Sequence, residues 1–151
     1  MALVDKTLNG DEMKQRLYTV SSEQRERVVS RLRAALEREP AVRFAYLYGS
    51  VLESDRVHDV DVGLYLQKAA LAGGAEISEA LSANLTAEIG IPMDIRILNE
   101  APLSFQYHAL RGQLLVCNDE DFLTDLIEDV ARRYLDLAPL LRRGTKDAFA
   151  A

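Results

Sequence analysis

The sequence of 151 residues has one cysteine, two histidines and no tryptophan. The single cysteine, Cys117, excludes an intrachain disulfide and a thiolate-bound metal, and the two histidines lack the spacing of zinc ligands. The chain also lacks an apolar run near the ~18 residues that a membrane span requires, and its first ten residues carry no signal-peptide core. We therefore expect a cytoplasmic protein that does not associate with membranes.

Basic residues are fewer than acidic ones, 18 against 24, so the formal net charge is −6. A free nucleic-acid duplex is a poor partner for such a surface, and we expect no stable direct binding of nucleic acid. The chain is 48 % apolar and 28 % charged, and its length suits one domain with a real core. Because residues 1–20 show no clear pattern, we divide the chain into an N-terminal extension, residues 1–20, and a domain with a C-terminal helix, residues 21–151.

Hydrophobic periodicity and the positions of glycine and proline predict four main helices and four strands. The predicted helices span residues 23–39, 75–89, 103–110 and 120–143, and the predicted strands span residues 43–48, 59–67, 92–98 and 113–117. The first strand is almost wholly apolar, which is typical of a central strand. The short connection after it favours antiparallel pairing with the second strand. This order predicts an α+β fold with a mixed sheet of about four strands flanked by helices.

The final predicted helix carries a long apolar stripe. Its members recur at helical spacing and are Phe122, Leu126, Ile127, Val130, Tyr134, Leu137 and Leu141. We expect this stripe to cover the sheet first. The remainder would serve a partner or a second copy, as in a homo- or hetero-oligomer.

Two acids lead the second predicted strand. Asp59 and Asp61 stand two residues apart, and side chains at that spacing in a strand point to the same face. Asp94, on the next predicted strand, joins them if the two strands are neighbours, which the helix between them allows. Three carboxylates without basic partners repel one another unless a cation binds, and Mg²⁺ prefers such ligands. We therefore predict that Asp59 and Asp61 bind metal, and that Asp94 orients or deprotonates an acceptor hydroxyl or acts as a further metal ligand.

A turn precedes these acids. Gly49 permits a tight bend and the close approach of a phosphate, and Ser50 offers a hydroxyl and an N–H group. Arg56, between the turn and the acids, is a candidate phosphate ligand because its guanidinium binds two oxygens at once. These three are the predicted nucleotide-binding residues. Each feature alone is common in turns and solvated strand ends, and their conjunction carries the prediction of nucleotidyl transfer.

Through Gly49-Ser50, Asp59-Val60-Asp61 and Asp94, the sequence resembles the minimal nucleotidyltransferase (MNT) branch of the DNA polymerase β-like superfamily. The resemblance covers residues 43–115 and implies a nucleotidyltransferase fold with Mg²⁺-dependent transfer of AMP from ATP. MNT proteins are typically antitoxins encoded beside a HEPN-domain ribonuclease toxin. The implied partner is therefore a cognate HEPN toxin. Attachment of AMP to a tyrosine of this toxin would inactivate it.

Two other hypotheses stay open. Eight residues, 51–58, separate Ser50 from Asp59, fewer than the ten of many MNT proteins. This shorter loop is compatible with an antitoxin that neutralises the toxin by stoichiometric binding without catalysis. Transfer of a nucleotide to a small molecule or to RNA is the third hypothesis, although a chain of this length leaves little room for an acceptor pocket. We interpret His58 as a loop residue rather than a proton shuttle.

Overall fold

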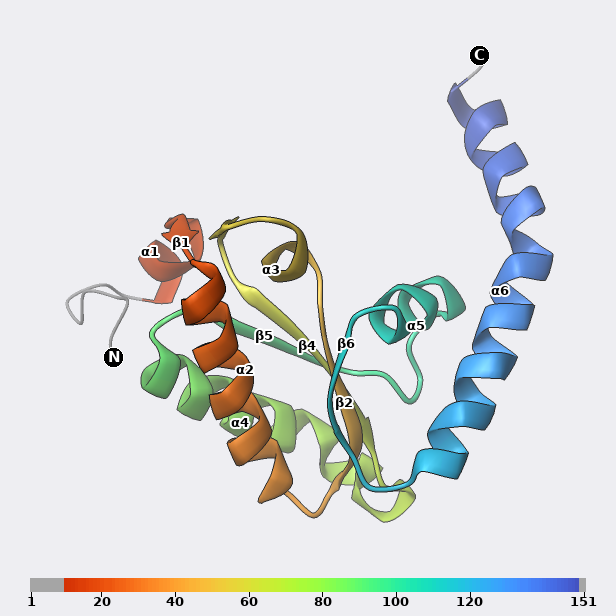
Figure 1. The fold of residues 1–151 in the computed structure, drawn as a ribbon. Helices are drawn as coiled ribbons and strands as arrows, with labels where there is room; N and C mark the ends of the chain where they lie inside the picture. The colour runs from red at the N-terminus through yellow and green to blue at the C-terminus, as the bar shows by residue number, and fades with distance from the viewer. Residues whose placement is uncertain (1–9, 150–151) are drawn as a thin grey trace.

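A four-stranded mixed sheet forms the centre of the fold (Figure 1), which confirms the predicted α+β class. The computed structural model describes the backbone of residues 10–149 and the side chains of residues 11–12 and 15–137. The strands of the sheet follow the order β5 (Met93–Ile97), β4 (Val60–Leu66), β2 (Val42–Tyr48) and β6 (Gln113–Cys117). A separate small sheet pairs β1 (Tyr18–Thr19) with β3 (Arg56–Val57). The helices are α1 (Gly10–Gln15), α2 (Ser22–Glu37), α3 (Ser50–Glu53), the 3-10 helix η1 (Lys68–Gly73), α4 (Gly74–Ile89), α5 (Leu103–Leu110) and α6 (Glu120–Phe149).

The pairing of the strands sets the positions of the acids. β2 lies between β4 and β6 and pairs antiparallel with both, which confirms that it is central. β4 and β5 are parallel neighbours, and η1 and α4 connect them, as a parallel crossover requires. In this register Tyr48 lies opposite Asp61, and Asp61 lies opposite Asp94. The strands predicted to carry the acids are therefore adjacent.

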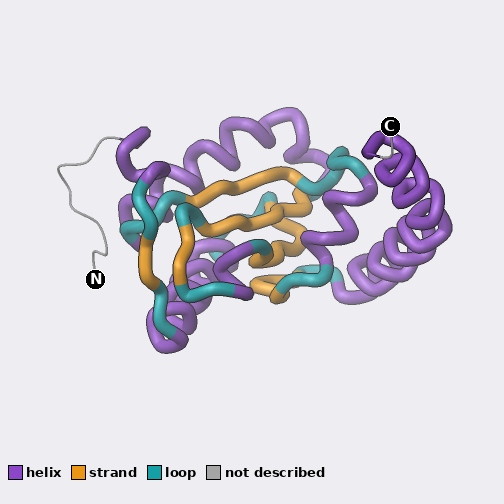
Figure 2. Tube along the Cα trace, turned by 90° about the horizontal axis from the view of Figure 1, so that it is seen from above, coloured by secondary structure: helices purple, strands orange, loops and turns teal. Residues whose placement is uncertain are grey.

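Helices cover both faces of the sheet (Figures 1 and 2). α2 and α4 pack on one face, where the buried residues of β4 are Val60, Val62, Leu64 and Leu66. α5 and α6 pack on the other face, where Phe44 and Tyr65 stack with 4.9 Å between their ring centroids. Because residues of a strand alternate between faces, Asp59 and Asp61 belong to the face that α5 and α6 cover.

The ends of two helices follow local signals in the sequence. Ser21 begins α2 through a capping box, in which its side chain accepts the N–H of Gln24 and the Gln24 side chain accepts the N–H of Ser21. α4 ends at Gly90, whose φ of 87° is left-handed. Both ends lie within two residues of the predicted ones.

α6 is longer than predicted. It continues through Gly144 to Phe149, since a helix tolerates one glycine at a cost of about 1 kcal/mol. Leu141 of the predicted apolar stripe lies outside the described side chains, as residues 1–9 lie outside the described chain. No helix between residues 10 and 149, α6 included, combines the length and apolar character that crossing a bilayer demands.

The connection between β2 and β4 is more structured than the predicted turn and loop. It contains α3 and β3, and β3 pairs with β1 from the N-terminal segment. Tyr18, which pairs with Val57, and Val20, directly after β1, are buried in the core. A pairing of two residues produces no periodic pattern, which is why the sequence does not reveal it. The domain boundary after residue 20 stays a prediction.

Candidate active site

Three carboxylates converge where β4 and β5 begin. One oxygen atom from each of Asp59, Asp61 and Asp94 lies within 4.8 Å of the other two. The strands produce this arrangement, because Asp61 and Asp94 are opposite each other and Asp59 shares the face of Asp61 two residues earlier. All three residues are half-buried. The structure thus brings together the acids that the sequence singled out, while their chemical roles stay predictions.

The surroundings of Asp61 favour its neutral form. Burial raises the pKa of Asp61 from 3.8 to about 6, and the carboxylates of Asp59 and Asp94 contribute to the rise. A hydrogen bond with Asp94 acts in the same direction, whereas the guanidinium of Arg96 opposes it. A cation that binds here must therefore displace a proton from the site when the pH is below about 6.

Arg96 is a basic partner of this acidic cluster. Its Nη2 lies 3.3 Å from Oδ2 of Asp94, and its Nε lies 3.4 Å from Oδ1 of the same carboxylate. This pairing raises the pKa of Arg96. The expectation of acids without a basic partner was therefore wrong. The signal was present in the sequence, because Arg96 follows Asp94 by two residues in β5 and so shares its face.

Gly49 joins β2 to α3 directly beside Asp61. Its φ is 84°, in the left-handed region that favours glycine. A Cβ atom at this position would run into Oδ2 of Asp61, so the missing side chain is what lets the turn lie against the carboxylate. Ser50 is the exposed first residue of α3. The nucleotide-binding roles of Gly49 and Ser50 stay predictions.

Two aromatic residues that the sequence analysis did not single out border the acids. Tyr48, opposite Asp61, packs edge-on against Phe105 of α5, with 5.5 Å between the ring centroids. Burial raises the pKa of Tyr48, and the nearby carboxylates raise it further, so its hydroxyl stays protonated. The guanidinium carbon of Arg96 lies 5.6 Å from the Phe105 ring centroid. The sequence signal for Tyr48 is its place directly before the glycine turn.

Arg56, the third predicted nucleotide-binding residue, lies in β3 rather than in an irregular loop. It pairs with Thr19, its side chain is exposed, and its N–H donates to Oγ of Ser54 at 3.1 Å. Its role as a phosphate ligand stays a prediction. His58 is exposed, and its Nδ1 lies 3.0 Å from the carbonyl oxygen of Arg16, as a loop residue would.

The carboxylate cluster has the chemistry of a site for a hard divalent cation. Such cations prefer oxygen ligands, and the three aspartate oxygens are close enough to surround one ion. Each of the three residues is half-buried, and three carboxylate oxygens are fewer than the six ligands that Mg²⁺ takes, so other oxygens would complete its coordination. Asp59, Asp61 and Asp94 could therefore hold a metal ion.

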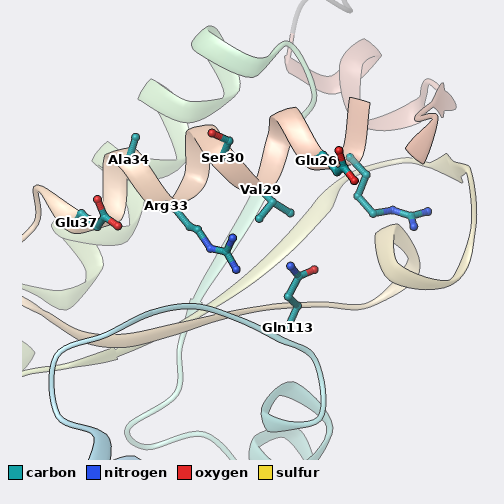
Figure 3. Close-up of a pocket in the computed structure, with 8 residues that line it drawn as sticks. Glu26, Val29, Ser30, Arg33, Ala34, Glu37 and Gln113 are labelled. Carbon is teal, nitrogen blue, oxygen red and sulfur yellow. The ribbon is translucent and has the colours of Figure 1, made fainter. Parts of the chain in front are cut away.

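A pocket of about 470 Å³ lies between α2 and β6, and none of the three aspartates lines it. Figure 3 shows Arg33 and Val29 of α2 pointing toward the strand and Gln113 pointing back toward the helix. Arg33 spans the gap, because its Nε donates to the carbonyl of Leu115 and its Nη2 to that of Leu114, both at 3.2 Å. The remaining lining mixes arginine and glutamate, so no ligand of one charge is favoured.

Comparison of sequences connects the site to a known family. Residues 30–121 match the family described as polymerase beta, nucleotidyltransferase, and this range contains the glycine turn and all three acids. No curated protein sequence matches the chain significantly.

Solved structures of toxin–antitoxin complexes share the fold. One chain of the crystal structure of MntA-HepT superposes with a TM-score of 0.55 and 15 % identity, over 87 % of this chain and 100 % of that chain. A mutant of this complex gives a TM-score of 0.59 and 16 % identity, over 84 % of this chain and 98 % of that chain. The complex of a tri-AMPylated Shewanella oneidensis HEPN toxin with MNT antitoxin gives 0.53 and 13 %, over 80 % of this chain and 98 % of that chain.

Proposed function

The chain belongs to the polymerase beta nucleotidyltransferase family, and we propose that it is an antitoxin that transfers AMP from ATP to a tyrosine of a cognate HEPN toxin. The convergence of Asp59, Asp61 and Asp94 beside the glycine turn carries this proposal. The fold shared with an MNT antitoxin bound to a tri-AMPylated HEPN toxin supports the choice of acceptor. We place the reaction in the cytoplasm, where ATP and Mg²⁺ are available.

Asp59 and Asp61 are the proposed ligands of Mg²⁺, with Asp94 as a further ligand or as the group that orients the acceptor hydroxyl. The ion would neutralise charge on the triphosphate and on the carboxylates. Gly49 lets the chain approach the phosphates closely, and Ser50 offers an N–H and a hydroxyl to their oxygens. Arg56 is retained as a candidate phosphate ligand, since its side chain is exposed and a guanidinium binds phosphate oxygens in pairs.

In the proposed reaction the tyrosine oxygen attacks the α-phosphorus of ATP. A bond forms between this oxygen and phosphorus, the bond from the α-phosphorus to the bridging oxygen breaks, and pyrophosphate leaves with the electron pair. The tyrosine proton passes to Asp94 or to water. Phe105 of α5 borders the site through Tyr48 and Arg96, so an acceptor that reaches Asp94 would lie near this helix.

Incubation of the purified chain with the HEPN protein encoded beside it, Mg²⁺ and ATP labelled on the α-phosphate tests the proposal. We expect label on the HEPN protein, the mass of AMP on a tyrosine, and loss of its ribonuclease activity. Asp59→Asn and Asp61→Asn should abolish labelling, since the amide keeps the size of the side chain and removes its charge. The toxin could instead remain unlabelled while wild type and both variants neutralise it equally, in a fixed molar ratio. That result would show that the protein acts by stoichiometric binding and not by catalysis.

A further inference from the structure

We propose that Arg96 is a positioning residue that holds the carboxylate of Asp94 in the three-aspartate cluster. The inference deepens the proposed function and rests on it for its kinetic readout. Arg96 faces both oxygens of Asp94, at 3.3 Å through Nη2 and 3.4 Å through Nε. An arginine fork in this arrangement fixes the plane of a carboxylate, which a single point charge does not do.

The need for such a residue follows from the crowding of charge. Asp94 stands opposite Asp61 and within 4.8 Å of two other carboxylate oxygens, and like charges favour rotation of its side chain away from them. The Asp94 side chain is 34 % exposed, so solvent is open to it if it turns outward. Arg96 opposes that rotation because its attraction acts on both oxygens together.

Arg96 is itself held from a second side. Its guanidinium carbon lies 5.6 Å from the ring centroid of Phe105, which also contacts Tyr48. A cation near an aromatic face is attracted to it, so α5 restrains the arginine that restrains Asp94. The side chain is nevertheless 58 % exposed, so Phe105 restrains Arg96 from one side only.

The fold supplies a matched control for this arrangement. Arg43 pairs with Asp119 at 2.8 Å, and its guanidinium carbon lies 3.5 Å from the Phe122 ring centroid. In this matched set of arginine, aspartate and phenylalanine, Arg43 is the second residue of β2, and Asp119 and Phe122 lie at the start of α6. The three acids lie beside Tyr48, which ends β2, about 17 Å from Arg43 along the strand. A general effect of losing an arginine–aspartate pair would appear at either set, and a positioning effect only at Arg96.

The experiment compares Arg96→Ala, Arg96→Lys and Arg43→Ala in AMP transfer to the HEPN toxin. Arg96→Ala should lower kcat about 10- to 100-fold, with KM for ATP within about threefold of wild type, because the partners of metal ligands affect activity on this scale. Arg96→Lys should remain at least about fivefold below wild type, since an ammonium does not hold both oxygens. Arg43→Ala should keep the wild-type kcat. Normal kcat in Arg96→Ala, full rescue by lysine, or an equal loss in Arg43→Ala overturns the proposal.

If the wild-type chain transfers no AMP, the proposed function is wrong but the positioning role of Arg96 is still testable. A second measurement then tests that role. Binding of Mn²⁺ in the presence of a non-hydrolysable ATP analogue is followed by electron paramagnetic resonance. Asp94→Asn and Arg96→Ala should each weaken Mn²⁺ binding about tenfold, and the double variant should bind no more weakly than either one. If Arg96 contributed only a positive charge and did not position Asp94, Arg96→Ala would leave Mn²⁺ binding unchanged or make it tighter. That result overturns the inference.

Discussion

Replacement of Asp61 by asparagine should make the metal-free protein more stable, although Asp61 lies at the centre of the proposed site. Burial and two neighbouring carboxylates raise the pKa of Asp61 from 3.8 to about 6, so the folded state binds a proton more tightly than the unfolded state. The stabilisation from neutral Asp61 is complete below about pH 4 and is lost as the pH rises through about 6. At pH 7.5 the folded chain therefore carries an unfavourable negative charge that asparagine removes.

The size of this effect follows from the same values. A change in pKa from 3.8 to about 6 corresponds to about 3 kcal/mol at neutral pH. Because Asp61 is only half-buried, solvent screening reduces this to about 1–1.5 kcal/mol. For a chain of this length, Asp61→Asn should raise Tm by about 3–5 °C.

The assay is thermal unfolding followed by circular dichroism in EDTA, at pH 7.5 and at pH 5.5. The gain should be largest at pH 7.5 and smaller by roughly a quarter at pH 5.5. It should nearly disappear only near pH 4, because Asp61 of the unfolded chain stays ionised until the pH approaches 3.8. Asp125→Asn, at an exposed position of α6, removes the same charge elsewhere and controls for net charge. A Tm for Asp61→Asn at or below that of the control at pH 7.5 would refute the account of crowded carboxylates.

Three further predictions concern the metal, the turn and the control pair. Mg²⁺ should raise the Tm of the wild type at pH 7.5, and the rise should be much smaller at pH 5.5, because Mg²⁺ competes with the proton on Asp61. Equal shifts in Tm at the two pH values would contradict this. Gly49→Ala should lower the free energy of unfolding by about 2 kcal/mol and abolish the Mg²⁺-dependent shift in Tm. Gly73→Ala, whose Cβ meets open space, should change neither stability nor the Mg²⁺ response. Calorimetry with and without Mg²⁺ measures both quantities, and a normal Mg²⁺ response of Gly49→Ala would disprove the steric argument. Arg43→Ala should lower the urea midpoint, through loss of the pair with Asp119 and of the contact with the Phe122 ring. An unchanged urea midpoint would show that these contacts contribute nothing.

The sequence was sufficient to predict that the three acids meet. Asp59 and Asp61 share a face because strands alternate, and the helix before Asp94 implies the parallel crossover that makes β5 a neighbour of β4. The apolar character of residues 43–48 likewise predicted the central strand, because a strand with neighbours on both sides is buried on both faces.

Features that depend on tertiary contact were not predictable to the same degree. The pairing of β1 with β3 joins two short segments far apart in the sequence, and it leaves no periodic pattern. The contact of Phe105 with Tyr48 and Arg96 depends on how α5 lies over the sheet, which residue spacing does not determine. The pair between Arg96 and Asp94 is different, since its spacing was visible in the sequence and was missed.

Arg33 has a consequence for how this protein meets other molecules. An edge strand with unpaired carbonyl groups can pair with a strand of another molecule, which promotes aggregation. In β6, the carbonyl groups of Leu114 and Leu115 already accept N–H groups from the Arg33 guanidinium. Addition of a further strand along β6 is thereby discouraged at these two residues.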